Sequence, residues 1–269
     1  MPETEARVPT ALTIAGSDSG GGAGIQADLK TFAALGVYGM SAVTAVTVQN
    51  TKGVSGYQEI APETVADQIR AVGTDIGVDA AKTGMLASAG IIEAVADALS
   101  EVRISNLVVD PVFISKHGHP LLQEDAVASL KERIVPLAAV VTPNLYEASG
   151  LAGAPVESRD DMKQVAEALL ALGPRSVLVK GGHLEGGRSA DLFFDGDCME
   201  WLEAERIDSA NTHGTGCVLS AAIAAYLARG NELLEAVARA KSFVTESIRH
   251  GLAIGQGIGP VNPMWEARA

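Results

Sequence analysis

The chain is short of positive charge. It has 20 Lys and Arg residues against 33 Asp and Glu, a formal net charge of -13 and a pI near 4.8. Nucleic-acid backbones and anionic membrane surfaces are bound by clustered Lys and Arg, so the composition argues against both as partners. A small polyanionic ligand would instead need a locally positive pocket, made by helix N-termini and one or two lysines.

Cysteine and long apolar runs are also scarce. Cys198 and Cys217 are the two cysteines, and they form neither a disulfide framework nor a zinc-binding spacing, which fits a reducing compartment. No apolar run approaches the roughly 20 residues that span a bilayer, and the N-terminus lacks the charged-then-apolar order of a signal peptide. We therefore expect a cytoplasmic protein.

Repeats, low-complexity tracts and internal linkers are absent from the sequence. With 269 residues, of which 47% are hydrophobic and 20% charged, the chain can fill a sizeable core. We expect one domain over residues 11–269, preceded by a flexible N-terminus over residues 1–10.

Short apolar strands alternate with helical segments along most of the chain. The expected strands are 11–15, 41–48, 54–60, 80–83, 106–109, 138–141 and 176–180, and an Asp-Gly turn within 192–201 predicts a β-hairpin. The expected helices are 25–35, 62–72, 88–101, 216–229 and 232–250, with others opening near residues 125, 144 and 158. Repeated right-handed β-α-β crossovers give an α/β fold, with one mostly parallel sheet covered by helices on both faces and the hairpin at one edge.

In such a sheet, ligands bind outside the carboxyl ends of the strands. The residues that follow the expected strands are therefore the candidates for a site. They are Asp18, Gln49, Met85, Asp110, Asn144, Glu147, Lys180 and the loop around Gly214.

The loop from Asn211 to Cys217 is the feature around which we expect the site to be organised. Two glycines flank Thr215 where a helix opens, so unpaired backbone N–H groups at the positive end of the helix dipole can bind a phosphate. Cys217 would lie in the first turn, where the dipole lowers a thiol pKa and favours a role as base. The alternative is a tight loop followed by a small core cysteine.

A second glycine motif, Gly22 to Ala27, matches a relaxed dinucleotide-binding fingerprint. That fingerprint needs an acidic residue at the end of the next strand to bind the ribose, and Gln49 and Asn50 stand there instead. No P-loop motif is present in the sequence either. These observations disfavour a nicotinamide-dependent dehydrogenase.

Several polar residues admit both a functional and a structural interpretation. Asn144 and Glu147 can face one side of a helix start and hold a metal-bound water, or they can simply cap the helix. Asp110 before Pro111 can form a turn or serve a metal shell. Lys180 ends an apolar strand, where its charge would cost desolvation unless an anion such as phosphate meets it.

Motifs along nearly the whole chain resemble those of the hydroxymethylpyrimidine and phosphomethylpyrimidine kinases of thiamine biosynthesis. The motifs are Ala11–Phe32, Val48–Thr51, Lys82–Met85, Asp110–Val112, Thr142–Glu147, Lys180–His183 and His213–Cys217. The resemblance implies a ribokinase-like, three-layer αβα fold. It also implies a kinase that uses ATP and Mg²⁺, with a monovalent cation left open, to phosphorylate 4-amino-5-hydroxymethyl-2-methylpyrimidine and then its monophosphate. Related kinases are commonly homodimers.

The resemblance also assigns roles to residues. A pyrimidine pocket would be lined by Gly16, Ala23, Asp28, Gln49, Met85 and Val112. Asp110, Asn144 and Glu147 would serve the magnesium shell; Lys180, Asn144 and Thr215 would bind ATP; and Gly214, Thr215, Gly216 and Cys217 would form the anion hole and base. Most sugar kinases of the superfamily carry Asp where Cys217 stands. A pyridoxal or pyridoxine kinase on the same fold and a non-catalytic pyrimidine-binding sensor remain as alternatives.

Overall fold

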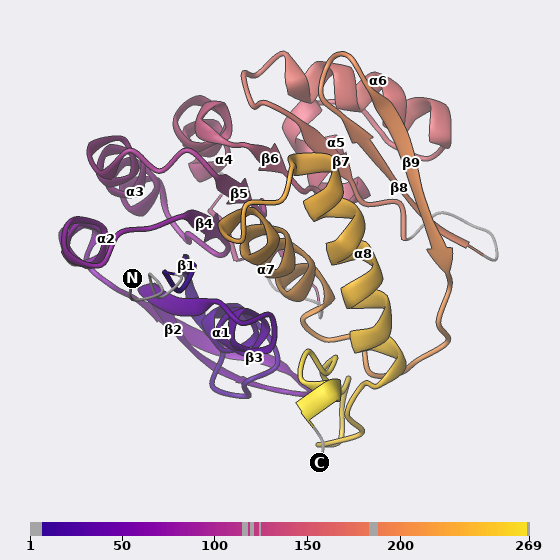
Figure 1. The fold of residues 1–269 in the computed structure, drawn as a ribbon, viewed down its shortest axis with the longest axis horizontal. Coiled ribbons are helices and arrows are strands. Elements are labelled where there is room, and N and C mark those ends of the chain that lie inside the picture. The colour runs from indigo at the N-terminus through magenta and orange to yellow at the C-terminus, as the bar shows by residue number, and fades with distance from the viewer. Residues whose placement is uncertain (1–6, 115–117, 119–120, 124, 183–187, 268–269) are drawn as a thin grey trace, which may run out of the picture.

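The structure is a computed structural model, and it describes residues 7–114, 118, 121–123, 125–182 and 188–267. Its central feature is a nine-stranded sheet in the order β3-β2-β1-β4-β5-β6-β7-β8-β9 (Figure 1). The strands are β1 (Thr10–Ser17), β2 (Tyr38–Asn50), β3 (Gly53–Glu59), β4 (Ala80–Thr83), β5 (Leu107–Val109), β6 (Val140–Val141), β7 (Val177–Val179), β8 (Arg188–Phe194) and β9 (Met199–Glu205).

Six neighbouring strands, from β2 to β7 across the sheet, run parallel, and both edges are antiparallel. The β8–β9 hairpin confirms the predicted edge, and Gly196 in its turn has φ +99°. The sequence did not predict the second antiparallel edge, formed by β3 on β2. Thr51 and Lys52 alone separate these strands, which is too short for the crossover helix that parallel pairing requires.

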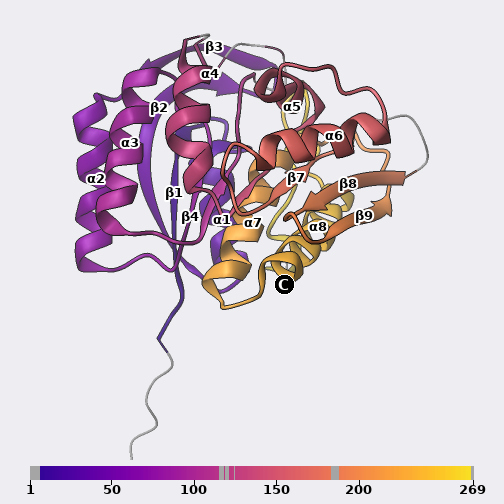
Figure 2. The same ribbon diagram turned by 90° about the horizontal axis from the view of Figure 1, so that it is seen from above.

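Helices cover both faces of the sheet, which confirms the three-layer α/β fold predicted from the sequence (Figures 1 and 2). One face carries α2 (Pro62–Asp75), α3 (Ala89–Val102), α4 (Ala126–Ser129), α5 (Leu145–Ala152) and α6 (Arg159–Leu170). The opposite face carries α1 (Gly24–Ala34), α7 (Thr215–Ala228) and α8 (Leu233–Arg249). Short helical turns over Leu130–Ile134, Val135–Leu137 and Trp265–Ala267 complete the described elements. No helix in the described ranges is both long and apolar enough to span a bilayer.

The two faces of the sheet bury separate cores because successive strand residues point to opposite sides. In β1, Leu12 and Ile14 pack with the layer of α2 and α3, whereas Ala11 packs with α1 and α7. Helix α7 is apolar almost all round and buried along most of its length, between the sheet and the neighbouring helices α1 and α8. This burial fixes the N-terminus of α7 at the carboxyl edge of the parallel strands.

Candidate active site

Most of the predicted site residues gather at this edge. Gly16, Gln49, Met85, Asp110, Asn144 and Lys180 stand at or just after the carboxyl ends of parallel strands, and Gly214 to Cys217 open α7. Asn144 and Lys180 lie in a β-bridge, which joins the segments that follow β6 and β7. Convergence of strand ends with one helix N-terminus, whose first residues are partly exposed, is the arrangement predicted for a phosphate site.

Lys180 links two buried carboxylates. Its Nζ lies 2.9 Å from Asp110 Oδ1 and 3.9 Å from Glu147 Oε2. The hydroxyl groups of Thr142 and Ser220 also contact the Asp110 carboxylate, at 3.3 Å each. Asp110 and Glu147 therefore compensate the charge of Lys180, so the argument that its burial requires a phosphate no longer holds by itself.

The three groups perturb one another's ionisation. Burial alone would lower the pKa of Lys180, but the Asp110 and Glu147 carboxylates hold that pKa above its ordinary value. Burial opposes ionisation of Asp110 too, yet Lys180 and Lys82 keep the pKa of Asp110 below its usual range. Burial raises the pKa of Glu147 to about 7 because it outweighs the attraction of Lys180, and Asp110 adds to the increase.

Asn144 and Glu147 form a capping box at the start of α5, as the structural alternative predicted. Asn144 Oδ1 accepts from the Glu147 N–H at 2.9 Å, and Glu147 Oε2 accepts from the Asn144 N–H at 2.8 Å. One oxygen of each side chain is thus engaged by the cap. The assigned roles of both residues at magnesium stay predictions.

The donor set fits a magnesium ion that arrives with phosphate. Mg²⁺ is usually held by one or two carboxylates together with water and substrate phosphates, and Asp110 and Glu147 supply two carboxylates at the cleft. Within the described part of the chain, no group of three or more His, Cys, Asp and Glu residues could hold a metal ion. The chemistry of the site therefore suits a metal shared with a nucleotide rather than a cage made by the protein.

Gly214 and Gly216 differ in what a side chain would meet. Gly214 is the N-cap of α7 with φ +82°, and a Cβ there would lie 1.9 Å from the Gly22 carbonyl oxygen. A Cβ on Gly216 would make ordinary contacts, 3.5 Å from Lys180 Nζ and 3.6 Å from Asp110 Oδ2. Gly214 is therefore required by backbone packing, whereas a Cβ on Gly216 would fit in contact with the lysine and the carboxylate.

Cys217 lies in the first turn of α7, as predicted, but its acidity differs from the prediction. Burial raises the pKa of the Cys217 thiol to about 11; the positive charge of Lys82 and the N–H donated by Gly24 oppose that increase. The prediction that the helix dipole makes thiolate available near neutral pH is thus wrong for the free protein, because desolvation prevails. Part of the residue still faces solvent, so water moderates the desolvation and a substrate hydroxyl can approach.

Asp28, which the resemblance assigns to the pyrimidine pocket, lies in the interior, and its role in that pocket stays a prediction. Its side chain is fully buried and forms an ion pair with Lys82, at 2.9 Å from Nζ to Oδ2. Thr13 Oγ1 donates to the same carboxylate oxygen at 2.6 Å. Asp28 projects from α1 into the interface with the sheet, which explains why it lies beneath the cleft.

The other predicted pyrimidine-pocket residues are placed near the strand ends. A Cβ on Gly16 would lie 3.1 Å from Met85 Sδ, so these two residues adjoin. Gln49 is half-buried, and its amide contacts Thr47 Oγ1 at 3.2 Å and His213 Nε2 at 3.3 Å. Ala23 is the N-cap of α1, and Val112 is partly buried two residues beyond Asp110. Their contact with a pyrimidine stays a prediction.

The structure pairs Asp18, one of the candidate residues that follow the strands, with His213 of the loop before α7. His213 Nε2 lies 3.0 Å from Asp18 Oδ2, and that oxygen also accepts from the N–H groups of Gly22 and Ala23. Burial would raise the pKa of Asp18, but the hydrogen bond with His213 holds it below its ordinary value. The pair ties the glycine loop after β1 to the loop before α7. Both residues stand in the glycine motifs, but the sequence carried no signal for their contact.

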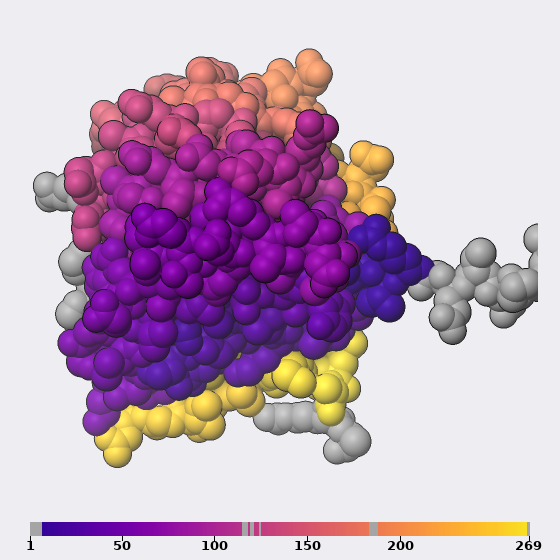
Figure 3. All heavy atoms as spheres, turned by 90° about the vertical axis from the view of Figure 1, so that its left-hand side faces the viewer, coloured from indigo at the N-terminus to yellow at the C-terminus, as the bar shows by residue number. Residues whose placement is uncertain are grey.

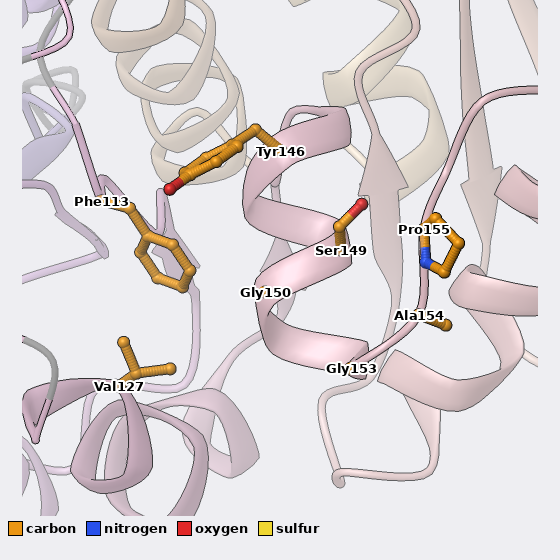
Figure 4. A pocket seen from close by; sticks show the side chains of 8 residues that line it. All are labelled: Phe113, Val127, Tyr146, Ser149, Gly150, Gly153, Ala154 and Pro155. Carbon is orange, nitrogen blue, oxygen red and sulfur yellow. The ribbon is translucent and has the colours of Figure 1, made fainter.

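A separate pocket of about 480 Å³ lies beside α5 (Figure 4). It is lined by Phe113, Val127, Tyr146, Ser149, Gly150, Gly153, Ala154 and Pro155, and Figure 4 shows the Tyr146 hydroxyl directed toward Phe113. None of these residues belongs to the predicted site.

His183, the last residue of the predicted Lys180–His183 motif, lies outside the described residues.

The fold has three layers, and the N-terminus of α7 lies beside Lys180 and two carboxylates. Together these features define a phosphotransferase with the ribokinase-like fold. A family model described as phosphomethylpyrimidine kinase matches residues 18–262. The chain belongs to this family, as its motifs predicted.

Individual relatives agree with this assignment. The chain is 52% identical to the hydroxymethylpyrimidine/phosphomethylpyrimidine kinase of Streptomyces coelicolor, over 96% of this chain and 95% of the relative. It is 54% identical to the thiamine biosynthesis bifunctional protein ThiED of Geobacter sulfurreducens, but it spans 51% of that longer protein. The ADP complex of Bacillus subtilis pyridoxal kinase superposes with a TM-score of 0.91 at 41% identity, covering 98% of this chain and 100% of that structure.

Proposed function

We propose that this protein transfers the γ-phosphoryl group of ATP to 4-amino-5-hydroxymethyl-2-methylpyrimidine and then to its monophosphate, in thiamine biosynthesis. The observation that carries the proposal is the convergence of Lys180, Asp110 and the α7 N-terminus at one sheet edge, where Gly216 places backbone without a side chain against the lysine. This geometry, in a member of the phosphomethylpyrimidine kinase family, supplies the anion-binding site that phosphoryl transfer needs.

Each part of the site has a place in the transfer. Backbone N–H groups of Thr215 and Gly216 and the Lys180 ammonium bind the phosphoryl oxygens as charge develops on them. Cys217, as thiolate, takes the proton of the acceptor hydroxyl while its oxygen attacks phosphorus and the bond to ADP breaks. Asp110 and Glu147, with Asn144 in support, would hold Mg²⁺. When bound, that ion neutralises charge on the nucleotide phosphates.

A phosphorus NMR assay tests the activity directly. With ATP, Mg²⁺ and the pyrimidine alcohol, we expect ATP to be converted to ADP while a monoester resonance appears and then gives way to a diphosphate. The same assay with pyridoxine examines the first alternative. Phosphorylation of pyridoxine alone would favour a vitamin B6 kinase, and binding without ATP consumption would favour a sensor.

The vitamin B6 alternative has a specific observation behind it, since the structural similarity described above is to a pyridoxal kinase. Gln49 distinguishes the two substrates. A glutamine amide offers a donor and an acceptor side by side, which matches the exocyclic amine and adjacent ring nitrogen of an aminopyrimidine. Pyridoxine has no such adjacent pair. We therefore assign recognition of the aminopyrimidine edge to Gln49.

Gln49→Leu is expected to reduce kcat/KM for the pyrimidine alcohol by roughly 5- to 150-fold, because an unpaired buried polar group costs about 1–3 kcal/mol. Use of pyridoxine should change much less. Steady-state kinetics with both alcohols would measure the difference, and Asn50→Leu, at the exposed neighbouring position, is the control. Equal losses for both alcohols would mean that Gln49 shapes the pocket without reading the ring.

We also propose that the protein is a homodimer, formed through the exposed face of β2 near its carboxyl end. Val46 and Val48 lie on one side of this strand and are 48% and 64% exposed. Figure 3 views the molecule from the side on which α2 and α3 lie in Figure 1, where residues of the N-terminal half of the chain form a continuous purple surface. Burying two exposed valines against a second copy would remove apolar surface from water.

Val48→Lys is accordingly expected to shift the protein from dimer to monomer in sedimentation velocity at micromolar concentration. The matched control is Ile76→Lys, which changes an exposed apolar residue just after α2, near the amino end of β1 rather than the carboxyl end of β2. A monomeric wild type, or a dimer that survives Val48→Lys, would contradict this surface.

The cytoplasmic location stays a prediction of the sequence.

A further inference from the structure

A buried ion pair lies between α1 and β4, and its lysine has no assigned part in the reaction so far. Lys82 on β4 and Asp28 on α1 are both fully buried, and their charged atoms are 2.9 Å apart. Asp28 Oδ1 has no hydrogen-bond partner within the described residues. Well-packed apolar side chains often stabilise a fold as much as a buried ion pair does. The pair therefore calls for a reason other than stability.

The position of the pair relative to Cys217 supplies that reason. The N–H of Gly24 donates to the Cys217 sulfur, and Asp28 lies one helical turn further along α1, on the same face. Helix α7, which carries Cys217, packs on both α1 and β4. Cys217 and Gly24, which are partly buried, thus adjoin the fully buried Asp28 and Lys82 where α1, α7 and β4 meet.

Lys82 extends to the carboxyl edge of the sheet. A Cβ on Gly84 would lie 3.0 Å from Lys82 Nζ, so the ammonium group lies against the turn that follows β4. Met85, the next residue, adjoins Gly16 at the predicted pyrimidine pocket. The lysine is therefore held under the acceptor side of the cleft.

The charges that act on Cys217 come from three elements. Lys82 favours the thiolate, whereas Asp28 and Asp110 oppose it. Lys180, on the far side of Asp110, interacts with the same thiol. Among these, Lys82 opposes the raised pKa of Cys217 most strongly, and Asp28 holds Lys82 in place.

We propose that Lys82 is a positioning residue for phosphoryl transfer, whose buried ammonium ion, held by Asp28, stabilises the thiolate of Cys217. This inference rests on the proposed role of Cys217 as base. The thiol proton leaves to water on the exposed side of Cys217, and the thiolate then accepts the proton of the acceptor hydroxyl. No electron transfer is involved.

Alkylation of Cys217 by iodoacetamide tests the proposal without any substrate. Cys198→Ser removes the other thiol, which lies in the distant β8–β9 turn, and Cys217→Ala on that background gives the blank. Two variants are compared with this background between pH 7 and pH 10. They are Asp28→Asn, and the double variant Lys82→Met with Asp28→Asn, which removes both buried charges together. Circular dichroism and thermal melting establish that each variant is folded.

The two variants should change the rate in opposite directions. Removing only the carboxylate should speed alkylation at a given pH by about tenfold, since a neighbouring charge shifts a pKa by about 1 or more. Removing both charges should slow alkylation by less than that, because the loss of Lys82, which favours the thiolate more than Asp28 opposes it, is partly offset by the loss of Asp28. A double variant that reacts as fast as the background overturns the proposal. Slower alkylation in Asp28→Asn also overturns it, by identifying Asp28 as the proton acceptor. Because no turnover is measured, these results are independent of whether the protein phosphorylates the pyrimidine.

Discussion

Cys217→Ala is expected to lower kcat by about 100-fold, the usual contribution of a positioned general base. Folding and ATP binding should persist, because the alanine keeps the first turn of α7 and loses one sulfur that accepts a hydrogen bond from Gly24. Turnover at saturating ATP, calorimetric ATP binding and melting temperature measure the three properties separately. Unchanged turnover would return Cys217 to the role of a small core residue.

The pH dependence offers a second test of the same role. Since burial raises the pKa of the Cys217 thiol to about 11, thiolate is the minor form at neutral pH and its population grows as pH rises. We expect log kcat/KM to increase with pH between about pH 6 and pH 9. Cys217→Asp, the residue of most sugar kinases in the superfamily, is the control, because an aspartate already ionised in this range should give a flatter profile.

Much of the fold followed from local patterns. Short apolar strands such as 80–83 and 106–109 correspond to β4 and β5 within a residue at each end, because strands buried on both faces carry near-continuous apolar residues. Helix caps and turns were also predictable because they depend on residues that are close in sequence. Ser158 and Asp161, for example, form the predicted capping box of α6. The antiparallel pairing of 54–60 with β2 was missed although the expected bounds, 41–48 and 54–60, leave only residues 49–53 between the strands, too short a connection for a parallel crossover.

The site was predictable where a residue's role depends on its own segment. The positions of Lys180, Asp110 and the α7 loop follow from where strands end and a helix begins. Contacts between segments that are far apart in the sequence could not be predicted in this way. Asp28 and Lys82 are 54 residues apart, and their pairing depends on how α1 packs on β4. The acidity of Cys217 depends on a balance between the helix terminus and desolvation, and burial of the thiol appears only in the folded structure.

The two glycines of the anion-binding loop can now be separated. Both were expected to let backbone N–H groups converge on the phosphoryl group, but the structure gives each a different environment. Gly214 needs φ +82° and approaches the Gly22 carbonyl too closely for any side chain. Gly216 is already helical, and a Cβ there would only touch Lys180 and Asp110. Substitution at each position should therefore affect a different property.

Gly216→Val should lower kcat/KM by on the order of 100-fold or more, because its methyl groups would occupy the space in front of Lys180 where the phosphoryl oxygens bind, and loss of one such set of donors typically costs that much. Its melting temperature should change little, since the added Cβ meets its nearest atoms at 3.5 and 3.6 Å. Gly214→Ala is the matched variant and should lower the melting temperature. Active-site titration would give turnover per folded molecule. If Gly216→Val lost stability but kept that turnover, the loop would be structural and the phosphate would bind elsewhere.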